Sequence, residues 1–124
     1  TGNRVGAEFY GLRYEPCPVD VRLRGDGESL RFGGQELKVV HIPGHTPGSI
    51  ALFADMGKRI LFGQDVHGPY TPILGGDPAQ AALSLRKLLA LEADILCEGH
   101  FGIYRPAEAV KAYIEGFLRQ LEPS

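Results

Sequence analysis

The stretch HIPGHTPGSI, residues 41–50, places one histidine, His45, between two Pro-Gly steps. Pro43-Gly44 is expected to end a strand and turn the chain, and Pro47-Gly48 to close the loop before the next strand begins. The stretch therefore predicts a short, stiff loop that aims one imidazole at a fixed point. A histidine that only fills a core rarely needs this much control of the backbone.

Apolar stretches on both sides of this loop predict strands. Residues 36–42, 49–54, 58–63 and 94–99 are short apolar runs bounded by turn residues, which is typical of buried strands. Alternating patterns at residues 19–23 and 29–32, separated by Gly-Asp-Gly, predict a strand-turn-strand unit. A sheet that is mixed or antiparallel follows from this order.

Two segments have helical periodicity instead. Asp77 as N-cap and Pro78 at the first helical position predict a helix over residues 78–93. A second helix is expected over residues 105–121, with an apolar face formed by Val110, Tyr113, Ile114, Phe117 and Leu121. Strands followed by helix, strand and helix indicate an α/β (α+β) fold, and residues 1–124 form a single domain because no second boundary is visible.

The composition excludes several function classes. The chain has 124 residues, is 44% hydrophobic and carries a net charge of -2, so neither nucleic acid nor an anionic membrane is an expected partner. No apolar run approaches the roughly 20 residues of a membrane span. Cys17 and Cys97 are far apart and outside any CxxC motif, which favours a reduced, cytoplasmic protein.

Three of the predicted strands end in the same way, with a glycine followed closely by a polar side chain. These ends are Gly44-His45, Gly63-Gln64-Asp65 and Gly99-His100. A lone histidine or aspartate at a strand end is commonly a surface residue, a helix cap or a turn former, but the repetition favours one shared site. Imidazole nitrogen and carboxylate oxygen are ligands for zinc, and also for iron or manganese.

HIPGHTPGS, LFGQDV and CEGH, in this order, resemble the later motifs of the metallo-β-lactamase fold in its glyoxalase II-like branch, from about Val19 to the end of the chain. The resemblance implies an αββα sandwich with a metal site at one edge. It implies that His45 binds a first metal, that His100 binds a second, and that Asp65 bridges both and is catalytic. The expected activity is metal-dependent hydrolysis of a thioester or related small molecule, in which a metal-bound hydroxide attacks a carbonyl, phosphoryl or sulfuryl centre.

The chain departs from the family because the motif H-x-H-x-D-H is absent: its histidines are His41, His45, His67 and His100. The chain therefore resembles the C-terminal half of the fold, without the N-terminal half that carries this motif. We expect weak or absent metal binding, zinc being the first candidate, and no hydrolysis by this chain alone. Apolar residues at 49–53 and 59–62 would then be exposed, which predicts self-association or pairing with the missing half.

Other residues are weaker candidates for the site. His67 and Tyr70 are expected to line a substrate pocket, whereas His41 is interpreted as structural. Glu98 is expected either to tune His100 or to face solvent.

Thr46 or Ser49 is expected to donate a hydrogen bond that orients His45. Two further hypotheses stay open for the whole protein: a di-iron redox protein on the same fold, and a non-catalytic module.

Overall fold

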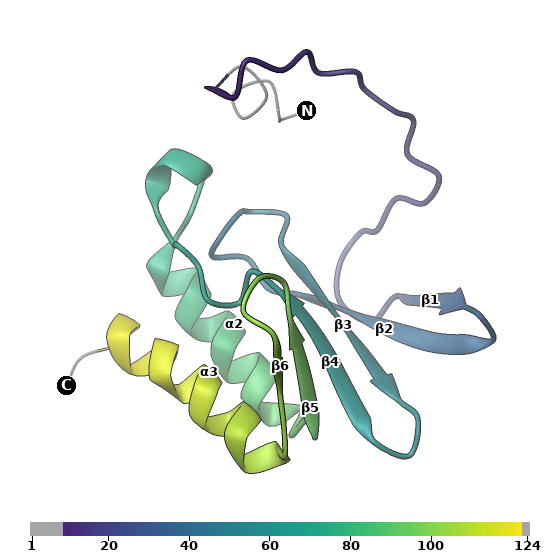
Figure 1. Cartoon of the computed structure of the whole chain (residues 1–124), viewed down its shortest axis with the longest axis vertical. Coiled ribbons are helices and arrows are strands. Elements are labelled where there is room, and N and C mark those ends of the chain that lie inside the picture. Colours follow the sequence, from purple (N-terminus) through teal and green to yellow (C-terminus); the bar gives the residue numbers. More distant parts are fainter. Residues whose placement is uncertain (1–8, 123–124) are drawn as a thin grey trace.

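A computed structural model describes residues 9–122 and contains one six-stranded sheet with two helices on one of its faces (Figure 1). The mixed sheet and the two helices confirm the expected α/β class and half-sandwich architecture. The elements in chain order are β1 (Ser29–Phe32), β2 (Gln35–His41), β3 (Ile50–Asp55), β4 (Arg59–Gln64), the 3-10 turn η1 (Pro72–Leu74), α2 (Pro78–Ala90), β5 (Ile95–Glu98), β6 (Ile103–Tyr104) and α3 (Ala107–Leu121).

The strand directions bring three loops to one edge of the sheet. The strands lie in chain order, and each neighbouring pair is antiparallel except β4 and β5, which are parallel. Helix α2 connects β4 to β5 and returns the chain to the end of the sheet at which β4 begins. Strands β2, β4 and β5 therefore run in the same direction, and their carboxyl ends meet at one edge.

The helices begin and pack largely as their sequences predict. Asp77 caps α2, since its carboxylate accepts hydrogen bonds from the backbone N–H groups of Ala79 (3.0 Å) and Gln80 (3.2 Å). Helix α2 ends at Ala90, three residues before the predicted end. The two helices and one face of the sheet enclose the core, whose buried members are Val40, Ile42, Ala51, Leu61, Val66, Leu85, Leu88, Ala93, Leu96, Val110 and Ile114.

Among residues 9–122, no helix covers the opposite face of the sheet. Alternation along the strands points Leu52, Phe62 and Ile103 away from the core, and the strand register joins them into one apolar row. Phe62 is 37% exposed and Ile103 65% exposed, whereas Leu61 on the helix side is fully buried. The expected exposure of residues 49–53 and 59–62 therefore holds for one face only, and self-association stays a prediction.

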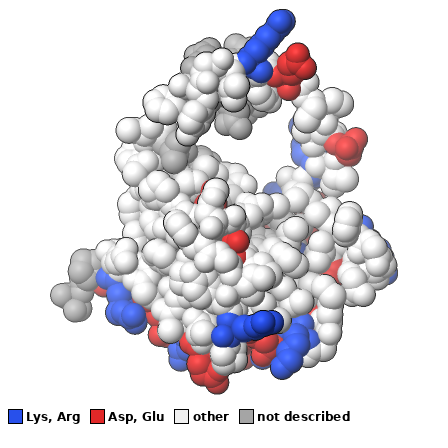
Figure 2. All heavy atoms as spheres, viewed as in Figure 1, with Lys and Arg blue, Asp and Glu red and all other residues white. Residues whose placement is uncertain are grey.

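The predicted strand at residues 19–23 is wrong. Residues 12–28 contain no strand, and they leave the sheet as an arc that encloses an opening in the space-filling view (Figure 2). Val19 is 71% exposed and Val21 61% exposed, because β1 pairs with β2 and this segment has no partner strand.

The short strand β6 was not predicted. Neither described helix is long and apolar enough to cross a membrane.

Gly44 fixes how the loop that carries His45 packs on α2. A Cβ atom at this position would lie 2.6 Å from the Cα and Cβ atoms of Ala81. The backbone φ of Gly44 is 153°, which is in the range that favours glycine. We expect Gly44→Ala to lower the free energy of unfolding by about 1–3 kcal/mol, because overpacking and backbone strain both oppose the native loop. Urea denaturation followed by circular dichroism measures this change.

Gly48→Ala is the matched control in the same loop. In the described part of the chain, no atom outside the two neighbouring residues lies within 4 Å of a Cβ built on Gly48. This substitution should change the unfolding free energy by less than about 0.5 kcal/mol. Equal losses in the two variants would contradict the packing role given to Gly44.

Candidate metal centre

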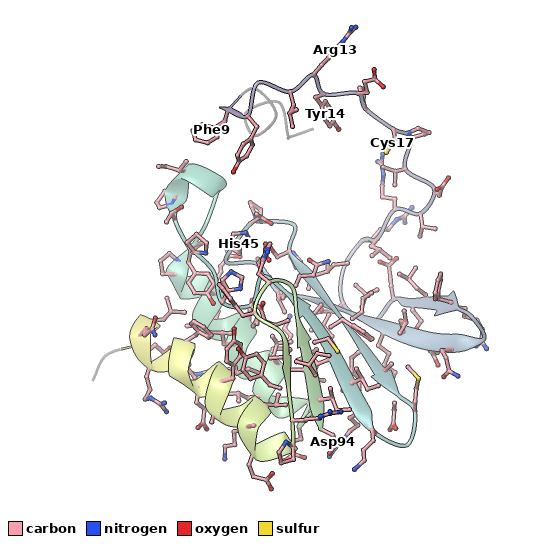
Figure 3. All side chains as sticks on the ribbon, in the orientation of Figure 1. Phe9, Arg13, Tyr14, Cys17, His45 and Asp94 are labelled. Atoms are coloured by element: carbon pink, nitrogen blue, oxygen red, sulfur yellow. The ribbon has the colours of Figure 1, made fainter. Side chains whose placement is uncertain are left out.

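The three strand-end residues predicted from the sequence meet at the carboxyl edge of the sheet. The carboxylate of Asp65 lies between two imidazoles, with Oδ2 3.2 Å from Nε2 of His45 and Oδ1 2.9 Å from Nε2 of His100. Figure 3 shows His45 among the strand-end loops, and Asp94 at the opposite end of the sheet. The convergence expected from the sequence is therefore present, with one oxygen of Asp65 facing each histidine.

The parallel pairing of β4 and β5 places Asp65 beside His100. The backbone N–H of Gly99 donates a hydrogen bond to the carbonyl of Gln64 (2.8 Å), so the two strand ends are held together. A Cβ atom at position 99 would lie 3.0 Å from Oδ1 of Asp65 and 2.9 Å from the Gln64 carbonyl oxygen. Glycine at position 99 thus lets the two chain segments approach closely enough for Asp65 to reach His100.

The loop that carries His45 is tied to α2 through its backbone. The carbonyl of Gly44 accepts the N–H of Asp77 (2.9 Å), and the hydroxyl of Ser84 donates to the carbonyl of Pro43 (2.7 Å). One residue of α2, Ser84, and the N-cap residue, Asp77, therefore hold the loop on the helix. The imidazole of His45 is accordingly only 17% exposed.

The hydrogen bond that orients His45 does not come from Thr46 or Ser49, so that prediction is wrong. The hydroxyls of these two residues lie 2.7 Å apart and bond to one another, which closes the loop. Nδ1 of His45 instead lies 2.6 Å from the backbone carbonyl of Pro69. A carbonyl group supplied by the backbone has no sequence signature, and this contact could not be predicted.

The protonation pattern of His45 shows why a cation fits the site. A carbonyl oxygen only accepts hydrogen bonds, so Nδ1 of His45 must carry a proton to bond to Pro69. In a neutral imidazole Nε2 then has a lone pair, and this lone pair faces the carboxylate of Asp65 at 3.2 Å. Two acceptors at this distance require a proton or a metal ion between them.

The spacing of the donor atoms agrees with metal binding. Two ligands bonded to one tetrahedral zinc at roughly 2.0–2.1 Å are about 3.3 Å apart. The separations of 3.2 Å and 2.9 Å between Asp65 and the two histidines are near this value. Within residues 9–122, however, no three His, Cys, Asp or Glu side chains form a group that could hold a metal ion. The residues described thus fit part of a metal centre.

A second layer of side chains lies beside His100. The ring of His67 is centred 5.6 Å from the His100 ring and 4.6 Å from the ring of Phe101. Glu98 pairs with Nδ1 of His67, and its side chain is fully buried. Its Oε2 accepts the backbone N–H groups of His100 and Phe101, so of the two alternatives for Glu98 contact with the His100 loop is observed and exposure of the side chain to solvent is excluded. His100 itself is 63% exposed and forms the rim of the site.

Tyr70 lines a small cleft together with His45 and Asp65, but its hydroxyl donates to the backbone carbonyl of Val66. The role of Tyr70 and His67 in binding substrate stays a prediction.

His41 bonds through Nε2 to the carbonyl of Pro47 (2.9 Å), as a structural histidine does.

On the body of the molecule, most charged side chains in Figure 2 lie along the lower edge of the view, away from the strand-end loops.

The phenol of Tyr70 should make stability sensitive to alkaline pH. Burial, with a smaller contribution from the negative charge of Glu98, raises the pKa of Tyr70 to about 12. Because the unfolded chain releases this proton near pH 10, the folded state binds more protons above that pH, and its stability falls as pH rises from about 10 to 12. The stabilisation is complete below pH 10.

Tyr70→Phe tests this assignment. At neutral pH the variant should lose about 0.5–1.5 kcal/mol, because the hydrogen bond to Val66 is removed. Between pH 10 and 12 its stability should fall less steeply than that of the wild type. Urea denaturation at several pH values measures both slopes, and parallel slopes would mean that Tyr70 does not titrate in this range.

The sequence of this chain is similar to those of known proteins. Residues 2–100 match the sequence profile of the Metallo-beta-lactamase superfamily. A hydroxyacylglutathione hydrolase of Aeromonas hydrophila is 36% identical over 98 residues, which cover 77% of this chain and 37% of that enzyme. The matches to the first three such enzymes cover 35% to 39% of their lengths, so the chain spans about two-fifths of these relatives.

Two solved structures are similar in fold. The metallo-beta-lactamase superfamily protein ST1585 of Sulfolobus tokodaii superposes with a TM-score of 0.66 at 20% identity, over 98% of this chain and 49% of that one. The protein TTHA1623, crystallised in a di-iron-bound form, superposes with a TM-score of 0.62 at 28% identity, over 82% of this chain and 51% of that one.

Proposed function

Because the chain belongs to the metallo-beta-lactamase superfamily, we propose that His45, Asp65 and His100 are part of the divalent-metal centre of a hydrolase. The observation that carries this proposal is the carboxylate of Asp65, which offers one oxygen toward each imidazole nitrogen. An aspartate placed in this way suits a ligand shared by two metal ions. A divalent metal bound there would supply a water activated at neutral pH and a Lewis acid for the scissile group.

This chain's own residues hold the ligands in place for that chemistry. The carbonyl of Pro69 keeps the proton of His45 on Nδ1, so that Nε2 is free to bind a cation. The small cleft lined by His45, Asp65 and Tyr70 lies beside these ligands. Zinc is the first candidate, and iron is a second because the similar structure of TTHA1623 is di-iron-bound.

The substrate class is proposed from the relatives. The Aeromonas hydrophila enzyme that is 36% identical is a hydroxyacylglutathione hydrolase, so a thioester of a small thiol is the substrate we propose. The reaction would be attack of water on the thioester carbonyl with release of the thiol. Asp65 is then the residue on which activity depends most, since both metal positions would share it.

The ligand count favours a centre that other residues complete. Catalytic zinc commonly has three protein ligands and a water, but among residues 9–122 Asp65 is the one side chain that forms an ion pair with His45 or with His100. We propose that the remaining ligands come from a metallo-β-lactamase half that carries H-x-H-x-D-H, or from a second copy. The residues of this chain alone would bind metal weakly and would not hydrolyse the substrate.

Metal content tests this division of the centre. The 124-residue chain, purified without chelator, should contain well below one zinc per chain by elemental mass spectrometry, since catalytic zinc commonly needs three protein ligands. Size-exclusion chromatography with light scattering gives the oligomeric state of the same sample. One or two equivalents of zinc in a monomer would contradict the proposal that ligands from outside the chain are required.

A fusion tests the reaction. An N-terminal metallo-β-lactamase half that carries H-x-H-x-D-H, joined ahead of this chain, should bind two zinc ions and release thiol from a hydroxyacylglutathione. Asp65→Asn should reduce kcat/KM by about two orders of magnitude or more, as is typical when a group that acts in the transition state is removed. Glu108→Gln, on the exposed surface of α3, is the control and should not change the rate. A metal-loaded fusion with no thioesterase activity would refute the proposed substrate class.

A further inference from the structure

The carboxylate of Glu98 is a buried charge next to the proposed metal ligand His100. Its side chain is fully buried, although it lies only two residues before His100 on the exposed rim. A carboxylate loses several kcal/mol of hydration on burial unless hydrogen bonds replace the lost water. The hydrogen bonds that replace this water therefore show which groups Glu98 holds in place.

Both oxygens of Glu98 accept hydrogen bonds from the site. Oε2 accepts the backbone N–H of His100 (2.7 Å) and that of Phe101 (2.9 Å), which fixes the turn that carries the His100 imidazole. Oε1 pairs with Nδ1 of His67, an imidazole that lies against the His100 ring at an interplanar angle of 86°. One side chain thus holds the backbone of His100 and also the ring that packs against it.

These contacts also fix the tautomer of His67. Oε2 of Glu98 already accepts two backbone N–H groups, and Oε1 faces Nδ1 of His67. A carboxylate only accepts hydrogen bonds, so Nδ1 of His67 must carry the proton. A neutral His67 then has its lone pair on Nε2, in a ring whose centre lies 5.6 Å from that of His100.

We propose that Glu98 is a positioning residue for the metal centre: it fixes the backbone turn of His100 and holds His67 in the tautomer whose Nε2 is a proton acceptor. This inference rests on the proposed function only in the statement that His100 binds metal. The turn geometry and the tautomer are properties of the metal-free chain. They can therefore be measured whether or not metal binds.

Glu98→Gln separates the two effects. Its single carbonyl oxygen can still accept the N–H groups of His100 and Phe101, but its amide nitrogen then donates toward Nδ1 of His67. His67 must therefore change to the tautomer with the proton on Nε2. Glu98→Ala removes both effects.

The first measurement is made on the metal-free 124-residue chain. Nitrogen-15 NMR should find the proton of His67 on Nδ1 in the wild type and on Nε2 in Glu98→Gln. Amide hydrogen exchange at His100 and Phe101 should be slow in both of these proteins, and at least about tenfold faster in Glu98→Ala. If Glu98→Ala does not fold, Glu98→Gln alone still tests the tautomer. A wild-type proton on Nε2 of His67, or the same tautomer in Glu98→Gln, would overturn the proposal.

The second measurement is zinc affinity by competition with a chelating dye, on the fusion described above. Glu98→Ala should weaken zinc binding by about 10–100-fold, the usual effect of losing a group that orients a ligand. Glu98→Gln should weaken it less, and the control Glu108→Gln should not change it. Affinity that is unchanged in Glu98→Ala would overturn the positioning role. Failure of the unsubstituted fusion to bind zinc would instead refute the proposed metal centre. The NMR results on the metal-free chain do not depend on zinc, so the two failures can be told apart.

Discussion

The common direction of β2, β4 and β5 is the constraint on which the rest of the structure depends. Two antiparallel connections separate β2 from β4, and the helical connection through α2 makes β5 parallel to β4. The residues that follow these strands, His45, Asp65 and His100, therefore emerge at one edge, although 55 positions separate the first from the last. A reversed β5 would place His100 at the end of the sheet where Asp94 lies in Figure 3.

Much of this arrangement could be predicted from the sequence because the signals are local. Asp77 and Pro78 mark the start of α2, and short apolar runs mark the central strands. The repeated pattern of glycine followed by His or Asp indicated one shared site, and the structure brings these three residues together. The alternation at residues 19–23 was misleading, because a strand needs a neighbour and β1 pairs with β2.

The parts that sequence reasoning missed depend on groups that only the folded chain brings together. The carbonyl of Pro69 orients His45, and any residue could supply a carbonyl. Glu98 is different, because the sequence named it and left two alternatives open, contact with His100 or exposure to solvent. Strand alternation could have decided between them: Glu98 lies two positions after Leu96, and alternation places both on the covered face of the sheet. A glutamate at an inward-facing position of a strand indicates a buried contact, and here that contact is the His100 turn.

The hydrogen bonds between the His45 loop and α2 would couple ligand binding at the site to local unfolding of the start of the helix. The carbonyls of Pro43 and Gly44 are held by Ser84 and Asp77, so the loop and the first turns of the helix should open and close as one unit. A ligand that binds only the closed form, at a free concentration 100 times its dissociation constant, adds about 2.7 kcal/mol to the stability of that form. Backbone amides in the first turns of α2 would then exchange hydrogen more slowly when the site is filled. They would do so although they do not contact the bound ion.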